Sequence, residues 1–198
     1  PEASVLMVSG DLEQVEIELL AGRLRCPGCA DGLGPWGGRG VARCEQRAVR
    51  HVGPPAAGAL SGLEGTHVLL GDDLLCRRRD EVAVIGSALV AHAAGDGHRA
   101  IAGRLGVPAS TVRGWLRRFR SRAAVIAAFF TTWALALAPG SDPPAPTGSV
   151  VGDAVEAVGM ATRAAVVRFG PAPVWSRAGR LCGGALLSNT SCLWLTPS

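Results

Sequence analysis

Apolar residues recur at three- and four-residue spacing over most of the chain after residue 80, which is the spacing of one face of a helix. An earlier segment, from Asp11 to about Ala21, has the same pattern behind an aspartate that can cap a helix. The pattern therefore predicts a mainly helical chain. The later predicted helices cover residues 80–94, 98–105, 108–120, 123–138 and 150–169, with a further short helix within 175–187.

The region between residues 30 and 65 has a different character, since it is rich in glycine and proline and shows little periodicity. Such a composition predicts loops with short strands, one around Ala48 and one over Thr66 to Leu70. The fold class we expect is therefore mainly α, with a small β-containing N-terminal module. Three of the helices, from residue 80 to residue 120, are expected to form a trihelical helix-turn-helix core.

Residues 106–111 have the features of the tight turn in such a core. Gly106 stands where the chain must turn sharply and where a positive φ is expected. Pro108 suits the start of the next helix. The hydroxyl of Ser110 or Thr111 can then accept hydrogen bonds from the free backbone N–H groups at that start.

The helix after this turn divides into an apolar and a polar side. Val112, Trp115, Leu116 and Phe119 fall at positions i, i+3, i+4 and i+7, which predicts one buried stripe. A recognition helix in the major groove of DNA needs this division, with short polar residues and arginine facing outward. The candidate DNA-contacting residues on and after this helix are Ala109, Ser110, Thr111, Arg113, Gly114, Arg117, Arg118, Arg120 and Arg122.

Charge adds to this picture through its distribution rather than its total. The 198-residue chain has a net charge of only +4, and all 20 of its lysine and arginine positions are arginine, a composition that GC-rich coding would explain. Five of them, however, lie between Arg113 and Arg122. Arg113 and Arg117 are placed to read guanine edges, and Arg118, Arg120 and Arg122 to contact phosphates. The alternative is an ordinary packing unit with a solvated arginine face.

The cysteines suggest a metal site near the N-terminus. Cys26-Pro-Gly-Cys29 resembles a zinc-ribbon knuckle, in which both thiolates of a tight turn bind one metal. Structural zinc needs four ligands, but Leu60 and Leu63 stand at the spacing where a second cysteine pair would be expected. Zinc binding at Cys26 and Cys29 therefore remains one interpretation of the sequence. The other is that Leu60 and Leu63 form an apolar contact in place of half of the metal site. Other possible ligands are Cys44, His51, His67 and Cys76.

The order of these features resembles an uncharacterised bacterial family whose members join a zinc-ribbon-like module to a transposase-type helix-turn-helix. The resemblance rests on Cys26-Pro-Gly-Cys29, the Thr66–Leu70 segment, the helix-turn-helix and the later helix around Asp153–Gly159. It implies DNA binding and a connection to mobile elements. It also implies a second cysteine pair, at the positions that Leu60 and Leu63 occupy here.

Several other function classes lack the residues they need. A catalytic transposase binds two divalent metals through clustered carboxylates, but only Asp142, Asp153 and Glu156 are acidic after Arg122. No nucleophile motif or phosphate-binding loop is recognisable. We therefore expect no enzymatic activity of the chain itself, and a partner transposase is a possible source of catalysis.

The uncharged segment at 123–138 is too short for a membrane span, which needs about 20 apolar residues. A buried or dimer-forming helix explains it better, with Phe129, Phe130 and Trp133 packing on the helix-turn-helix or on a second copy of the chain. A homodimer would suit the two-fold sites that helix-turn-helix proteins often bind.

The start of the chain shows no basic region followed by an apolar run, so we expect a cytoplasmic, nucleoid-associated protein.

These features predict a chain of several segments. Its main expected binding partner is double-stranded DNA. A protein-interaction module with an incidental basic face remains the alternative. The expected segments are a zinc-ribbon-like module (1–75), a helix-turn-helix domain (78–122), an apolar packing or dimer helix (123–138), a proline-rich linker (139–149) and a C-terminal helical segment (150–198).

Overall fold

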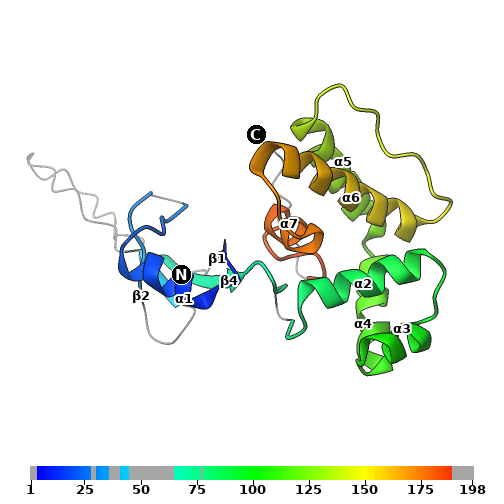
Figure 1. Ribbon diagram of the computed structural model, residues 1–198, viewed down its shortest axis with the longest axis horizontal. Coiled ribbons are helices and arrows are strands. Elements are labelled where there is room, and N and C mark those ends of the chain that lie inside the picture. The colour runs from blue at the N-terminus through cyan, green and yellow to red at the C-terminus, as the bar shows by residue number, and fades with distance from the viewer. Residues whose placement is uncertain (1–3, 28–29, 36–40, 45–64, 77, 189–198) are drawn as a thin grey trace, which may run out of the picture. The chain divides into compact units, whose positions relative to one another are not determined.

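The computed structural model describes residues 4–27, 30–35, 41–44, 65–76 and 78–188 (Figure 1). The chain divides into two compact units, residues 1–71 and residues 72–198. Unit 1 contains a small sheet and unit 2 consists of helices, so the predicted fold class is confirmed.

A four-stranded mixed sheet forms the centre of unit 1, with its strands in the order β1-β4-β3-β2. Strand β1 pairs in parallel with β4, while β3 is antiparallel to both β4 and β2. The strand predicted over Thr66 to Leu70 is confirmed as β4, and the one predicted around Ala48 lies outside the described residues. The strands are β1 (Ser4–Val8), β2 (Gly34–Pro35), β3 (Val41–Cys44) and β4 (Gly65–Gly71).

Helix α1 (Leu12–Leu20) connects β1 to the rest of the unit. Asp11 caps it as predicted, since its carboxylate accepts a hydrogen bond from the Gln14 backbone N–H at 3.1 Å. Leu19, Cys26 and Leu33 form the buried centre of unit 1. Strand β1 was not predictable from the sequence, because its partner strand lies about sixty residues further along the chain.

Unit 2 contains six helices in its described part, and their bounds agree with the predicted ones to within two residues for α2 to α6. Helix α7 occupies the first half of the segment in which a short helix was predicted. The helices are α2 (Val82–Ala93), α3 (His98–Leu105), α4 (Ala109–Arg120), α5 (Ala123–Leu137), α6 (Val150–Phe169) and α7 (Val174–Leu181).

All six helices contribute to one hydrophobic core. Ile85 of α2, Phe119 of α4, Phe130 of α5 and Leu186, which follows α7, are completely buried in it. Helix α5 lies alongside α6 over most of its length, as Figure 1 shows, and α2 contacts α4, α6 and α7. The helix-turn-helix is therefore packed together with the helices that follow it.

The aromatic residues of α5 are part of this core. Phe129 and Phe130 meet edge to face with ring centroids 5.1 Å apart, and Phe129 packs in the same way against Trp133. These three side chains thus pack within their own chain. A dimer through α5 would have to use the exposed residues of the helix, such as Val125, which is 51% exposed.

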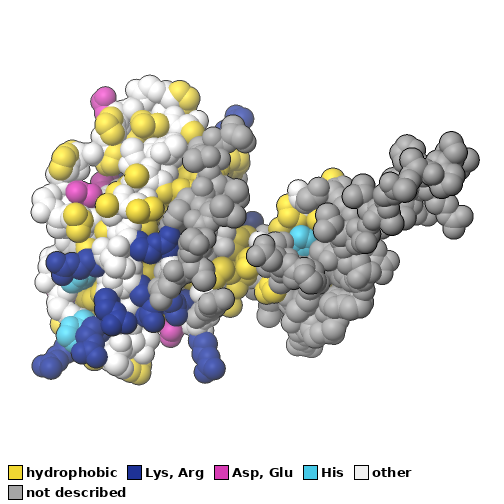
Figure 2. Space-filling view, turned by 180° about the vertical axis from the view of Figure 1, so that it is seen from behind, with side chains coloured by type: hydrophobic (Ala, Val, Ile, Leu, Met, Phe, Trp, Pro, Cys, Tyr) yellow, Lys and Arg dark blue, Asp and Glu magenta, His cyan; other side chains and the backbone are white. Residues whose placement is uncertain are grey.

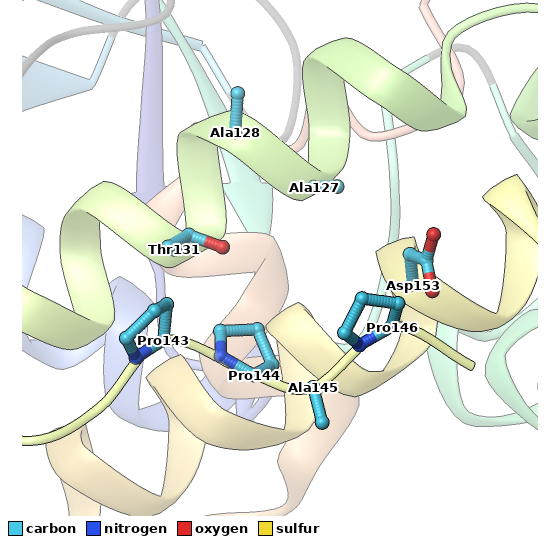
Figure 3. A pocket seen from close by; sticks show the side chains of 8 residues that line it. All are labelled: Ala127, Ala128, Thr131, Pro143, Pro144, Ala145, Pro146 and Asp153. Atoms are coloured by element: carbon cyan, nitrogen blue, oxygen red, sulfur yellow. The ribbon is translucent and has the colours of Figure 1, made fainter. Parts of the chain in front are cut away.

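The proline-rich segment between α5 and α6 lies against α5 instead of extending into solvent. Pro143 to Pro146 border a groove of about 300 Å³ whose other wall includes Ala127 and Thr131 of α5 (Figure 3). At its end, the backbone N–H and the hydroxyl of Thr147 both donate to Asp153 Oδ1, at 2.7 and 2.8 Å. This segment therefore contributes to the fold of unit 2.

Candidate nucleic-acid interface

The turn between α3 and α4 has the geometry that the sequence predicts. Gly106 ends α3 in the left-handed conformation, with φ 65° and ψ 24°, and its N–H donates to the Ala102 carbonyl. Helix α4 then begins at Ala109, directly after Pro108. The sharp turn of the chain between α3 and α4 thus depends on Gly106, which has no side chain.

The predicted capping role of Ser110 or Thr111 is wrong. No side-chain hydrogen bond caps α4, because the capping position is held by Pro108, which has no hydroxyl. Ser110 and Thr111 lie inside the first turn, and the N–H of Thr111 donates to the Pro108 carbonyl. Their hydroxyls therefore remain at the surface of the first turn of α4.

The inner side of α4 is buried as predicted. Val112 and Phe119 are completely buried, and Trp115 and Leu116 are at most 7% exposed. They pack with Ile101 of α3 in the core of unit 2. This packing fixes the rotation of α4 about its axis and so decides which of its residues face solvent.

The outer side of α4 carries most of the candidate DNA-contacting residues. Arg113, Arg117 and Arg120 are exposed, as is Ser110. The remaining candidates are partly buried: Ala109, Thr111, Gly114, Arg118 and Arg122. Figure 2 shows arginine side chains gathered on the end of unit 2 that contains α3 and α4.

Two of the predicted phosphate-contacting arginines are bound to carbonyl groups of their own chain. Arg118 Nη1 donates to the Gly114 carbonyl at 3.2 Å, one turn back on α4. Arg122 Nη1 donates to the carbonyl of Ser188, near the end of the described chain. The structure thus separates these two arginines from the exposed Arg113, Arg117 and Arg120.

Arg78 is a basic residue of this surface that the sequence analysis did not select. It precedes α2, and its guanidinium lies beside that of Arg118 in a groove along α4. Its Nη2 donates to the Leu187 carbonyl at 3.0 Å. The run of three arginines at residues 77–79 was the available signal, but the sequence does not show which element such a run contacts.

The candidate metal ligand Cys26 lies in unit 1 beside a histidine. Cys26 Sγ is 3.3 Å from His67 Nε2, and both residues are buried. Cys29, His51, Leu60 and Leu63 lie outside the described residues, and Cys76 belongs to unit 2. The described residues alone contain no group of three or more possible metal ligands, but they omit Cys29.

The comparisons with known proteins concern the helix-turn-helix. Residues 80–125 match the sequence model of a helix-turn-helix family described as a homeodomain-like domain. The match covers α2, α3 and α4, the three helices of the predicted core. No curated protein and no solved structure matches the chain.

Unit 2 therefore contains a homeodomain-like helix-turn-helix, a class of domain associated with DNA binding. Among the described helices, none combines the length and the apolar character that crossing a membrane requires.

Proposed function

We propose that this chain binds double-stranded DNA sequence-specifically by inserting the outer side of α4 into the major groove. The observation that carries the proposal is the division of α4, which buries Val112, Trp115 and Phe119 and exposes Arg113 and Arg117. A recognition helix must be held rigidly on one side while its other side reaches the bases.

Arg113 and Arg117 are four residues apart and therefore project from the same side of α4. A guanidinium can donate two hydrogen bonds to O6 and N7 of a guanine, which makes arginine suited to reading G·C pairs. Arg120, closer to the end of the helix, is exposed and is assigned to a backbone phosphate. In this proposal the bases are read by the first two residues, while Arg120 supports affinity.

The test is binding of the full chain to random-sequence duplex DNA over a series of salt concentrations. A protein that contacts phosphates loses affinity with a log–log slope of about −0.9 for each contact. Random-sequence DNA mostly lacks the preferred bases, and in such non-specific complexes charged side chains bind phosphates instead. The double variant Arg113→Ala, Arg117→Ala should therefore bind more weakly and with a flatter slope. The matched control is Arg163→Ala, Arg168→Ala, which removes the same charge from exposed positions on α6.

Equal loss in the two double variants would show that charge alone, and not α4, explains binding. Failure of the folded wild-type chain to bind at low salt would favour the alternative, a protein-interaction module with an incidental arginine surface. The affinity for a hydrophobic protein partner would, unlike the affinity for DNA, depend little on the salt concentration.

The biological role we propose is that of a transposon-associated DNA-binding protein or a transcriptional regulator, acting in the cytoplasm on the nucleoid. The proposal includes no catalytic step by this chain, and a partner transposase would perform any strand transfer. A homodimer stays a prediction. Light scattering over a concentration series tests it, since a mass equal to that of one chain at every concentration would contradict a dimer.

We also propose that Cys26 and His67 bind zinc together with Cys29. Two ligands of a tetrahedral zinc are about 3.6 Å apart, given metal–ligand distances of about 2.0–2.3 Å. The separation of 3.3 Å between Cys26 Sγ and His67 Nε2 fits that arrangement, and these atoms come from segments 41 residues apart. A bound zinc would connect the cysteine knuckle to β4.

Metal content of the purified full chain tests this second proposal. About one zinc per chain is expected for the wild type, and much less for Cys26→Ser and for His67→Gln. Cys76→Ser, which changes a cysteine of unit 2, should retain the metal. A wild-type chain that is folded and free of zinc after purification in zinc-containing medium would contradict the proposal.

A further inference from the structure

We propose that Arg78 and Arg118 form a binding site for a phosphate group in the groove between the segment preceding α2 and helix α4. The inference rests on the proposed function, because it assigns the phosphate to the backbone of bound DNA. The same chemistry would also bind free inorganic phosphate, and the experiment below distinguishes the two sources.

The groove has a volume of about 350 Å³ and is open to solvent. One wall is the segment before α2, with Arg78, Arg79 and Asp80, and the other is one side of α4 from Ser110 to Arg118. Three arginines including Arg118 therefore face one carboxylate, which leaves the groove with an excess of positive charge. An excess of guanidinium groups in a confined space favours an anion.

The two guanidiniums are held near one another by neutral carbonyl groups. Arg78 donates to the Leu187 carbonyl and Arg118 to the Gly114 carbonyl. Partial burial and the charge of Arg118 lower the pKa of Arg78, against the opposing effect of Asp80. Like charges held together repel one another, and a phosphate between them would relieve that repulsion.

Arg118 has a donor that the fold leaves unused. Its Nε is buried, and within the described part of the chain no acceptor forms a hydrogen bond with it. A buried donor without a partner is unfavourable. An oxygen of a phosphate in the groove is an acceptor of the kind that a guanidinium binds with two parallel hydrogen bonds.

The remaining donors come from the first turn of α4. The hydroxyls of Ser110 and Thr111 belong to residues that line the same groove. This is the end of α4 where the helix dipole is positive, and its effect adds to the charge of the arginines. The groove thus offers both charge and short polar donors to a tetrahedral oxyanion.

Gly114 keeps Arg118 in place. A β-carbon built at Gly114 would lie 3.1 Å from Arg118 Nη1, closer than an ordinary contact. The absence of a side chain therefore lets the guanidinium lie against the helix backbone, where it reaches the Gly114 carbonyl. A side chain at position 114 would therefore displace the Arg118 guanidinium by a few tenths of an ångström.

The experiment uses the full chain in two arms. In the first, the salt dependence of binding to random-sequence duplex DNA is compared for the wild type, Arg118→Met and the control Arg163→Met on α6. Loss of one phosphate contact should reduce the log–log slope by about 0.9 for Arg118→Met and leave it unchanged for the control. Thermal unfolding of each variant confirms that it is folded.

The second arm follows the Nε–H signals of the arginines by NMR while inorganic phosphate is added, with chloride at equal ionic strength as reference. A shift of the Arg118 signal by phosphate alone, with an unchanged DNA slope in Arg118→Met, would assign the site to the free anion. If neither the slope nor the signal responds, the phosphate site is overturned.

The two proposals fail in different ways. If the wild type does not bind DNA but phosphate shifts Arg118, the DNA-binding function is wrong and the anion site stands. If DNA binding depends on Arg113 and Arg117 but not on Arg118, the function stands and the phosphate site on DNA is wrong.

Discussion

The indole ring of Trp175 in α7 covers the backbone of Gly86 in α2. A β-carbon built at Gly86 would lie 2.2 Å from each of three ring atoms, a separation that real β-carbons essentially never show. Gly86 is buried in the middle of α2, and Trp175 is partly buried where it packs against the core of unit 2. This contact brings α7 onto α2, the first of the three helices of the helix-turn-helix domain.

Gly86→Ala should therefore destabilise unit 2 although alanine is the better helix former. Overpacking in a core typically lowers the free energy of unfolding by about 1–3 kcal/mol, and it should exceed the gain of roughly 1 kcal/mol in helix propensity. The measurement is the free energy of unfolding in urea, with tryptophan fluorescence as the signal.

Gly103→Ala is the matched control, since Gly103 lies in α3 with open space around its β-carbon position. There the same substitution should stabilise the chain by about 0.5–1 kcal/mol. An equal effect of the two substitutions would contradict the close packing of Trp175 on Gly86.

The turn of the helix-turn-helix should tolerate few residues at position 106. With φ at 65°, Gly106 adopts a conformation that costs a residue with a β-carbon about 1–2 kcal/mol. Gly106→Ala should lower the free energy of unfolding by that amount, and Gly106→Asn by less, because asparagine tolerates this region better. Unfolding in urea checks both variants, and an alanine variant as stable as the wild type would disprove the assigned strain.

Acid should loosen the contact between Thr147 and α6. The hydrogen bonds from the Thr147 backbone N–H and hydroxyl hold the pKa of Asp153 below its ordinary value. A depressed carboxylate pKa gives stabilisation that is present above the unfolded pKa of about 3.9 and lost as the pH falls through the folded pKa. We therefore expect the contact to persist at neutral pH and to weaken below about pH 4.

The chemical shift of the Thr147 amide proton, followed from pH 7 to pH 2, measures this effect. Asp153→Asn should abolish most of the change. Asp142→Asn removes an exposed carboxylate from the same interhelical segment and should leave it intact. A titration that survives in Asp153→Asn would identify another group as its source.

The Cys182 thiol should react slowly in the native protein. Burial raises the pKa of this thiol to about 12, against backbone hydrogen bonds that lower it. Only thiolates are alkylated readily, so at pH 8 very little of the reactive form is present. Alkylation at pH 8, followed by peptide mass spectrometry, should label Cys182 far more slowly in the native chain than in denaturant. Equal rates in both states would contradict its burial.

The helices of unit 2 were predictable from the sequence because their signals are local. The spacing of Val112, Trp115, Leu116 and Phe119 specifies one side of α4 whatever that side packs against. The position of Gly106 identifies the turn on the same principle, since its backbone conformation depends on its own missing side chain. Exposure of Arg113 and Arg117 then follows from the burial of the opposite side.

The partners of the arginines were not predictable, because they lie far away in the sequence. Arg120 and Arg122 look equivalent as residue types, yet Arg122 binds a carbonyl 66 residues further along the chain. The pairing of β1 with β4 and the contact of Cys26 with His67 have the same long-range origin. The local spacing of apolar and polar residues does not show which distant residues will be in contact.

The hydrogen bond between Arg78 and the Leu187 carbonyl spans 109 positions of the chain. A ribosome releases the N-terminal part of a protein first, so α2, α3 and α4 emerge well before Leu187 is made. A nascent chain therefore displays α4 before the Leu187 carbonyl is available to Arg78. Only a polypeptide that has been synthesised beyond Leu187 has the complete groove, and shorter nascent chains should consequently hold DNA less firmly.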